Sequence, residues 1–256
     1  MENKKVTLSI AIAVYNEEKN LEACLASVQS IADEIVVVDG GSTDGTVSIA
    51  KRFTSNIVRT SNPPIFHINK QKALDGCTCD WILQLDADEI IPEDLKKEII
   101  WTINNKQEAI NGYFIPRKNY FWGHWMRKGG QYPDYVIRLV RRGAARFPSK
   151  TVHEQIAVDG EVGYLTHPME HFTTKTYQDY WRKADAYITL TAMEMKRNGV
   201  SKNALTWCMY NIIKPKLTFL SLFIRHKGCM DGWYGLVFAY FSALHFPIAY
   251  KKFQKL

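Results

Sequence analysis

The chain has 256 residues, of which 46% are hydrophobic and 23% are charged, so a mainly disordered protein is excluded. Its formal charge of +7 is unevenly spread: residues 1–199 hold 25 basic and 25 acidic side chains, whereas residues 200–256 hold eight basic side chains and one acid, Asp231. This distribution argues against a nucleic-acid partner, because the larger part of the chain is neutral and the basic part is also the most apolar.

The cysteines and the N-terminus indicate a reducing compartment. Five cysteines without regular spacing do not form the framework of a disulfide-rich secreted protein. Cys77 and Cys79 have no second cysteine pair and no nearby histidine, which a zinc site needs. The apolar run 6–14 is short, and no small-residue cleavage site follows it, so we expect no signal peptide.

The first 90 residues alternate buried strands with helices. Apolar, β-branched runs predict strands at 6–14, 35–39, 57–59 and 81–85. Helices are expected between them, at 16–30, 44–54 and 67–76. Asn16 is the expected N-cap of the first helix, and Ser42 or Thr43 that of the second. The alternation predicts an α/β fold with a mostly parallel sheet and flanking helices.

The pattern changes after residue 90. Further strands are expected at 113–116, 136–140 and 162–165, separated by aromatic and basic loops, and a helix at 176–198. One loop combines Trp122-Gly-His-Trp125 with Arg127-Lys-Gly-Gly130. Aromatic faces suit sugar rings and a glycine pair allows close backbone approach, so this loop is either a lid over a sugar acceptor or a packed aromatic loop.

Three polar clusters follow buried strands: Tyr15-Asn-Glu17, Asp39 with its glycine turn, and Asp86-Ala-Asp88. In open parallel sheets, ligands bind beyond the carboxyl ends of the strands. Asp86 and Asp88 could both reach one Mg²⁺ or Mn²⁺ ion, although an isolated Asp-x-Asp is commonly a solvated turn. Asp39 could cap its turn or accept hydrogen bonds from a base or ribose. The chain lacks the glycine-rich dinucleotide fingerprint and the phosphate-binding P-loop.

Four motifs resemble those of the family 2 glycosyltransferases in order and spacing. They are Ala11-Ile-Ala-Val-Tyr-Asn-Glu-Glu18, Val38-Asp-Gly-Gly-Ser-Thr-Asp-Gly-Thr46, Gln71-Lys-Ala73 and Leu85-Asp-Ala-Asp-Glu89. The resemblance implies an inverting, nucleotide-sugar-dependent enzyme with the GT-A fold. The later part is similar to the bacterial branch that adds sugars to the lipopolysaccharide core. That similarity is carried by Arg138-Leu-Val-Arg141, Val152-His-Glu154, His171, Lys227-Gly228 and Asp231-Gly232.

The resemblance implies roles for particular residues. Those implied to bind the nucleotide sugar are Ala11, Tyr15, Glu17, Asp39, Lys72 and Asp86. Asp86, Asp88 and His171 are implied to hold Mg²⁺ or Mn²⁺. The chain departs from the family at Ala73, where an Asn is usual, and near Ala13, where a Pro is usual.

Inversion requires a carboxylate that takes the proton of the attacking hydroxyl. Many family members carry a Glu-Asp or Asp-Asp pair for this purpose, and this chain has none after residue 94. Glu154 is the expected base because of its distance along the chain from Asp88, and Asp134 is its competitor. For each of them, the alternative is a surface carboxylate without a catalytic role.

Residues 200–256 are predicted to form an amphipathic, membrane-associating helical region, and residues 1–199 the GT-A glycosyltransferase domain. Residues 232–250 carry no formal charge, are rich in aromatics and are flanked by basic residues. A spanning helix needs roughly 20 mostly apolar residues, so this segment is marginal. We expect it to lie on the cytoplasmic face of an anionic membrane, with a true span or a packed helical subdomain as alternatives.

Together these features predict a metal-dependent, inverting glycosyltransferase, peripheral on the inner face of the cell membrane. It would move a hexose from a nucleotide diphosphate sugar, with a UDP-sugar favoured, to a lipid-borne saccharide such as the lipopolysaccharide core or another cell-envelope glycan. One alternative is a phosphatase that uses Asp-x-Asp, but such an enzyme would carry its motif on the first strand. Another is a non-catalytic, sugar-binding membrane protein.

Overall fold

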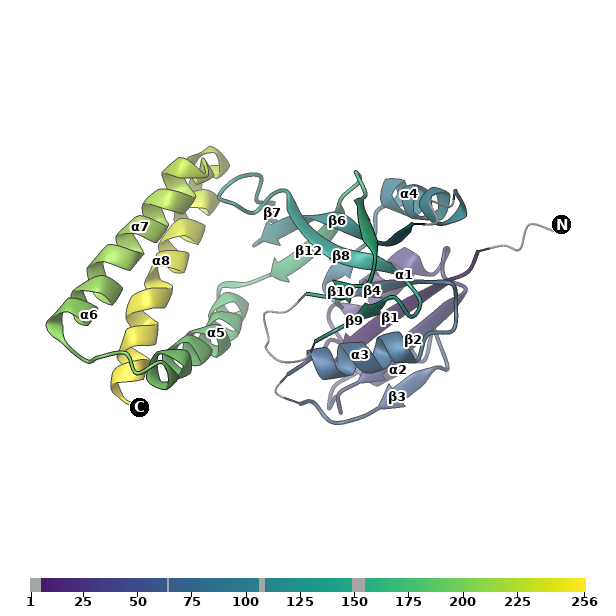
Figure 1. Cartoon of the computed structure of the whole chain (residues 1–256), viewed down its shortest axis with the longest axis horizontal. Coiled ribbons are helices and arrows are strands. Elements are labelled where there is room, and N and C mark those ends of the chain that lie inside the picture. The colour runs from purple at the N-terminus through teal and green to yellow at the C-terminus, as the bar shows by residue number, and fades with distance from the viewer. Residues whose placement is uncertain (1–5, 64, 106–108, 149–154) are drawn as a thin grey trace. The chain divides into compact units, whose positions relative to one another are not determined.

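The computed structural model describes residues 6–63, 65–105, 109–148 and 155–256. The chain forms two compact units, each made of two chain segments (Figure 1). Unit 1 comprises Met1–Arg117 and Tyr135–His171, and unit 2 comprises Lys118–Asp134 and Phe172–Leu256. These boundaries follow packing. The expected functional boundary at residue 199 remains a prediction.

Unit 1 is built on a sheet whose first strands match the predicted ones. The N-terminal strands are β1 (Leu8–Val14), β2 (Glu34–Asp39), β3 (Ile57–Arg59) and β4 (Trp81–Leu85). The strands that follow are β5 (Glu89–Ile90), β6 (Ile110–Phe121), β8 (Asp134–Arg141), β11 (Glu161–Tyr164) and β12 (Met169–Thr174). Residues 118–121 of β6, 134 of β8 and 172–174 of β12 belong to unit 2. The sheet order is β3-β2-β1-β4-β8-β6-β12-β5. The pairs β1–β2, β2–β3 and β1–β4 are parallel, and β8 is antiparallel to β4.

Helices cover both faces of this sheet. They are α1 (Leu21–Val28), α2 (Thr46–Ala50), α3 (His67–Asp75) and α4 (Glu93–Asn104). Strand side chains alternate between the faces, so Ile10 and Ile12 of β1 pack in the cluster that holds the buried residues of α1 and α4. Ala11 points to the other face, where α3 packs. The predicted fold class, a mostly parallel sheet with flanking helices, is confirmed.

The structure corrects the expected helix starts. Asn16 is not the N-cap of the first helix: its φ is +54°, in the left-handed region, and α1 begins at Leu21. Ser42 and Thr43 do not cap α2 either, because Gly45 is its N-cap residue. Their side chains instead bond across to the loop that contains Asn16. Helix α4 was not predicted, although Leu95, Ile99 and Ile103 repeat at helical intervals and are buried.

Within the described ranges, three further strands, each of two residues, form short antiparallel pairings. β9 (Ala145–Arg146) and β10 (Ala157–Val158) form a separate antiparallel pair. β7 (His124–Trp125) pairs with the end of β6, so the aromatic loop expected at 122–125 contains the turn of a hairpin. Trp122 and Gly123 both have positive φ in that turn.

Unit 2 consists of this hairpin and a group of helices. Its helical elements are α5 (Tyr177–Arg197), α6 (Ala204–Cys208), η1 (Met209–Ile213), α7 (Lys214–Leu220), η2 (Ser221–Arg225), η3 (Gly228–Asp231) and α8 (Gly232–Gln254). In Figure 1, α6 and α7 follow one another in one long helical run beside α8. The bounds of α5 confirm the helix expected at 176–198. α5 packs against α8 through Ala192, Met195, Tyr250 and Phe253.

Within the described part of the chain, no helix is long and apolar enough to cross a membrane.

Candidate active site

The three polar clusters predicted from the sequence all lie in unit 1. Tyr15 to Glu17 follow β1, the glycine turn follows Asp39 at the end of β2, and Asp86 follows β4. Because β1, β2 and β4 are parallel, their carboxyl ends share one edge of the sheet. β2 and β4 flank β1 on opposite sides, which is the switch point at which open α/β sheets bind ligands.

The loops after β1 and β2 are locked together. The Asn16 N–H donates to Ser42 Oγ at 2.9 Å, and the Thr43 N–H donates to Asn16 Oδ1 at 2.8 Å. The Glu17 N–H donates to Thr46 Oγ1 at 2.8 Å. These bonds hold together two loops that are about 27 residues apart in the chain and that carry the residues expected to bind the nucleotide.

Asp39 is almost completely buried, and its carboxylate accepts bonds from the Gly41 and Ser42 N–H groups, both at 3.2 Å. It therefore caps its own turn. A carboxylate has about four acceptor sites, so the turn does not use up its capacity. Contact with a base or ribose remains a prediction. Tyr15 is 44% exposed, whereas the Ala11 side chain is fully buried, and their nucleotide-pocket roles also remain predictions.

Two cations neutralise Asp86. Lys70 Nζ lies 2.5 Å from Oδ1, and Arg138 Nη2 lies 2.6 Å from Oδ2. Burial would raise the pKa of Asp86, but the charges of Arg138 and Lys70 outweigh it and hold that pKa well below its usual range. The cation that α3 contributes here is Lys70. Lys72, expected from the resemblance, is exposed and donates to Thr60 Oγ1 at 2.7 Å.

Glu89 is fully buried and closes the turn that carries the two aspartates. Its Oε2 accepts from the Asp86 N–H at 2.9 Å, and its Oε1 lies 2.7 Å from Arg138 Nη2. Arg117 Nη1 lies 3.6 Å from the same Oε1. Arg138 also donates to Gln84 Oε1, so one buried guanidinium ties β8 to β4 and to the Asp86 turn. This network makes the turn rigid.

Asp88 and His171 are brought together by strand pairing. His171 of β12 is paired with Glu89 of β5, next in sequence to Asp88. As a result, His171 Nε2 lies 3.6 Å from Asp88 Oδ1. Burial lowers the pKa of His171 and outweighs the nearby carboxylates, which favours the neutral imidazole that metal ligation requires.

The donor set fits a shared Mg²⁺ or Mn²⁺ ion rather than a metal held by protein alone. Among the described residues, no group of three or more His, Cys, Asp or Glu side chains is arranged to hold a metal ion. Asp88 and His171 supply one oxygen and one nitrogen. Mg²⁺ is commonly held by one or two carboxylates together with substrate phosphates, and Mn²⁺ also accepts imidazole. Asp86, with each oxygen in an ion pair, fits a metal less well than Asp88 does.

Among the described residues around the Asp86-Ala-Asp88 turn, carboxylates and cations are equal in number. The carboxylates Asp86, Asp88 and Glu89 face the cations Lys70, Arg117 and Arg138. A divalent cation and a doubly charged sugar diphosphate could enter together without adding net charge.

The structure describes only one of the two candidates for the catalytic base, Asp134. Glu154 lies outside the described residues, together with the rest of Val152-His-Glu154. Asp134 lies in unit 2, where the buried Asn119 Nδ2 donates to its Oδ2 at 3.0 Å and to the Gln131 carbonyl at 3.1 Å. Beside Gln131, Tyr132 packs edge-on against Trp125 of the aromatic hairpin, with ring centroids 5.4 Å apart. The catalytic role of either carboxylate remains a prediction.

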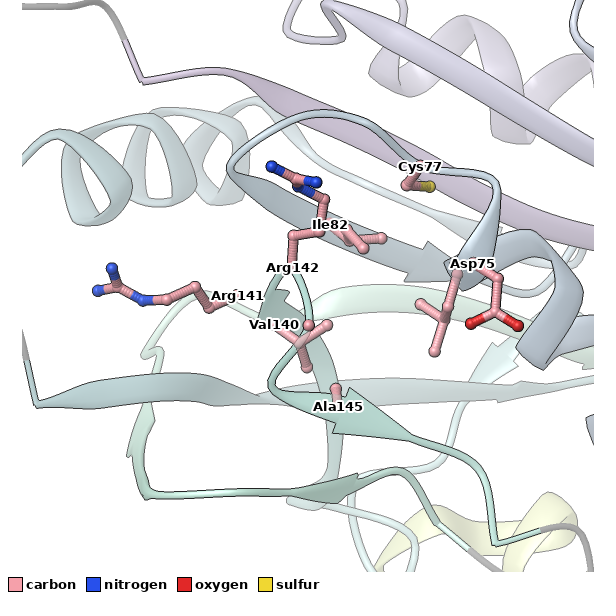
Figure 2. A pocket seen from close by; sticks show the side chains of 9 residues that line it. Asp75, Cys77, Ile82, Val140, Arg141, Arg142 and Ala145 are labelled. Atoms are coloured by element: carbon pink, nitrogen blue, oxygen red, sulfur yellow. The ribbon is translucent and has the colours of Figure 1, made fainter.

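A separate cavity of about 240 Å³ lies near the start of β4, at the opposite end of that strand from Asp86. Its lining residues include Asp75, Cys77, Ile82, Val140, Arg141 and Arg142 (Figure 2). The Arg141 side chain points away from Asp75 in this view, and its guanidinium lies 5.1 Å from the centre of the Trp81 ring. The cavity is distinct from the strand-end site, and we assign it no role.

Sequence reasoning missed most of the residues that organise the site. Lys70, Gln84 and Arg117 were not singled out, and Glu89 and Arg138 entered only as parts of motifs. A charged residue inside an apolar strand, such as Arg138 within 136–140, is itself a signal, because a buried charge needs partners. The sequence could not show which carboxylates those partners are.

Comparison with known proteins identifies the family of the chain. The model of the family "Glycosyl transferase family 2" matches residues 9–171. The lipopolysaccharide core biosynthesis glycosyltransferase LpsC of Rhizobium meliloti (strain 1021) is 31% identical over 258 residues, covering 93% of this chain and 91% of LpsC. An uncharacterized glycosyltransferase of Rickettsia bellii (strain RML369-C) is 38% identical over 209 residues, covering 75% of this chain and 68% of that protein.

Among solved structures, the mannosyltransferase PcManGT of Pyrobaculum calidifontis, in complex with GDP-Man and Mn²⁺, has a TM-score of 0.53 and 13% identity. The match covers 98% of this chain and 88% of PcManGT, and it shows the shared GT-A fold. The match to the family model includes the Asp86-Ala-Asp88 turn and ends at His171. The chain is a glycosyltransferase and belongs to glycosyl transferase family 2.

Proposed function

We propose that this glycosyltransferase is metal-dependent and inverting, and that it transfers a hexose from a nucleotide diphosphate sugar to a lipid-borne saccharide of the cell envelope. The observation that carries the proposal is the Asp88–His171 pair, held beside the buried Asp86–Arg138–Glu89 network at the carboxyl edge of the sheet. The Mn²⁺ and GDP-Man bound by PcManGT support a metal and a sugar nucleotide. The name of LpsC supports a lipopolysaccharide-type acceptor.

In this proposal, the locked loops after β1 and β2 bind the nucleotide. Tyr15 and Glu17 border the base, and Asp39 accepts from the base or ribose at the end of β2. Lys70 and Arg138 hold Asp86 ionised beside the ribose. Asp88 and His171 would hold Mg²⁺ or Mn²⁺, which when bound stabilises the charge of the departing diphosphate.

The acceptor hydroxyl attacks the anomeric carbon from the face opposite the diphosphate, and a carboxylate takes its proton. Glu154 is the proposed base, and Asp134, oriented by Asn119, is the alternative. A lipid-borne acceptor and a basic, aromatic C-terminal region support a peripheral location on the inner face of the cell membrane.

The direct test is to measure release of nucleoside diphosphate from a panel of UDP- and GDP-sugars with Mn²⁺ or Mg²⁺, with and without lipid-linked acceptors. We expect turnover that requires metal and is accelerated by an acceptor, with the anomeric configuration inverted in the product. Turnover that is undiminished by chelation would contradict the metal requirement. Failure to turn over or bind any donor would contradict the whole proposal.

The base is tested by a matched pair of isosteric variants. Glu154→Gln should keep donor binding and lose transfer, typically by two to four orders of magnitude. Asp134→Asn should transfer at a near-normal rate. The opposite pattern, an active Glu154→Gln and an inactive Asp134→Asn, would assign the base to Asp134.

A further inference from the structure

The helical run 204–225 of unit 2 exposes a continuous set of apolar side chains. The exposed apolar residues at three- and four-residue intervals, here called the apolar stripe, are Leu205, Met209, Ile212, Ile213, Leu217, Leu220 and Ile224. Side chains at such intervals share one face of a helix. Leu205, Leu217 and Ile224 are the most exposed, at 73%, 61% and 62%. None of the residues from 204 to 225 is buried.

The uncharged segment 232–250 behaves differently from what the sequence suggested. α8 buries residues on several sides, among them Val237, Ala239, Ala243 and Tyr250. It packs against α5 and α7. Membrane contact of 232–250 remains a prediction, but this segment buries part of its apolar surface within unit 2, whereas the preceding helical run buries no residue. Trp233, at the first turn of α8, and Met230, just before it, are also exposed, at 68% and 67%.

The charges of this region are segregated. Asp231, the one acid after residue 200, is buried, and its carboxylate accepts from the Arg127 and Lys128 N–H groups at 3.1 and 2.8 Å. By contrast, Lys216 and Arg225 are exposed on the helical run, and no ion pair to either occurs among the described residues. The surface that this run shows to solvent is thus apolar and positive.

We propose that the apolar stripe is a docking surface for an anionic lipid bilayer, with the run 204–225 lying in the plane of the headgroups. Exposed Leu, Ile and Met side chains would enter the acyl boundary, and the basic side chains would contact lipid phosphates. Lys216, between Ile213 and Leu217, can extend its charge to the headgroups while its stem stays among apolar groups.

Two features favour a bilayer over a second copy of the chain. A copy would place the exposed cations of one stripe near those of the other, without a carboxylate to balance them. A bilayer with anionic headgroups complements both the apolar and the positive character, and exposed Trp side chains are common at membrane interfaces. The inference rests on the proposed function in one respect: a lipid-borne acceptor would be found at the bilayer surface to which the stripe docks.

The test is cosedimentation of the full-length protein with vesicles, in the absence of donor and acceptor. We expect binding to phosphatidylcholine vesicles that contain about one third phosphatidylglycerol, and much weaker binding to phosphatidylcholine alone. Leu217→Glu combined with Ile224→Glu should lower partitioning by at least about tenfold. Lys216→Gln and Arg225→Gln should each lower it about fivefold on the anionic vesicles.

The controls are Met193→Glu, an equally apolar and exposed position on α5, and Arg197→Gln, an exposed charge at the end of α5. Both should leave partitioning unchanged. Circular dichroism on heating checks that every variant folds, and Leu217→Ser is the milder substitute if the double variant does not.

Full partitioning of folded Leu217→Glu/Ile224→Glu would overturn the proposal. So would a wild-type protein that ignores anionic vesicles and instead self-associates through the stripe, as seen by analytical ultracentrifugation. Because no turnover is measured, this failure is distinct from a failure of the glycosyl-transfer proposal, which the donor panel tests.

Discussion

At the scale of single residues, Arg138 is the side chain on which the site depends most. Its side chain is 7% exposed, and its guanidinium contacts Gln84, Asp86 and Glu89. Buried charges are tolerated only when they are paired and hydrogen-bonded, and removing one partner leaves the others uncompensated. The same residue therefore supports the fold and sets the position of the turn that carries Asp88.

Replacing Arg138 with Met should destabilise the protein by about 3–5 kcal/mol, because fully buried Glu89 would lose its close cationic partner and be left facing Arg117 at 3.6 Å. Urea denaturation measures the change. Arg142→Met, an exposed arginine nearby in sequence, is the control and should shift stability by less than about 0.5 kcal/mol. Equal stability of Arg138→Met and the wild type would show that the buried network is not a structural requirement.

His245 is expected to make the stability of unit 2 depend on pH. Its Nε2 lies 3.0 Å from Thr191 Oγ1, between α8 and α5, and burial lowers its pKa. A group whose pKa is depressed in the folded state binds protons more readily when unfolded. Its contribution to stability is therefore complete above the unfolded pKa of about 6.5 and is lost as the pH falls through the folded pKa.

We expect the free energy of unfolding of the wild type to decrease between about pH 7.5 and 5.5, and His245→Gln to show a shallower decrease. Urea denaturation at several pH values checks this, and His226→Gln, which replaces an exposed histidine, is the control. If the His245→Gln curve runs parallel to that of the wild type, protonation of His245 is not coupled to unfolding.

At the scale of elements, the strands were predictable and the loops between them were not. β1 to β4 could be located because β-branched, apolar runs are local signals. Asn16 could not be placed in the same way, because its conformation depends on Ser42 and Thr43, which are 26 and 27 residues further along the chain. Helix α4 was within reach, since its apolar spacing is regular.

The interlocked loops predict a role for Thr46, which is fully buried at the start of α2. Its hydroxyl accepts from the Glu17 N–H and donates to Asp44 Oδ1. Thr46→Val keeps the shape and removes both bonds, so it should cost about 1–3 kcal/mol and raise KM for the donor more than it lowers kcat.

Thermal unfolding and initial rates at varied donor concentration measure both effects. Ser48→Ala, at an exposed position of the same helix, should change neither. An unchanged donor KM in Thr46→Val would separate these loops from nucleotide binding.

At the scale of the whole molecule, the sequence predicted a division between a neutral catalytic region and a basic tail. The basic excess does lie in residues 200–256. Packing, however, assigns residues 118–134 and α5 to the same unit as this tail. That assignment depends on contacts such as those between Asp231 and residues 127–128, about 100 positions earlier, which no local pattern reveals. The pairing of β5 with β12, which sets His171 beside Asp88, could not be predicted for the same reason.

The central claim is that Asp88 and His171 hold a divalent cation shared with the donor diphosphate. Electron paramagnetic resonance can measure Mn²⁺ binding to the full-length protein with and without UDP or GDP. We expect the preferred nucleotide to tighten Mn²⁺ binding, and Asp88→Asn and His171→Ala each to weaken it by at least about tenfold, while Asp94→Asn, an exposed carboxylate on α4, binds as the wild type does. Wild-type Mn²⁺ affinity in folded Asp88→Asn would contradict the claim.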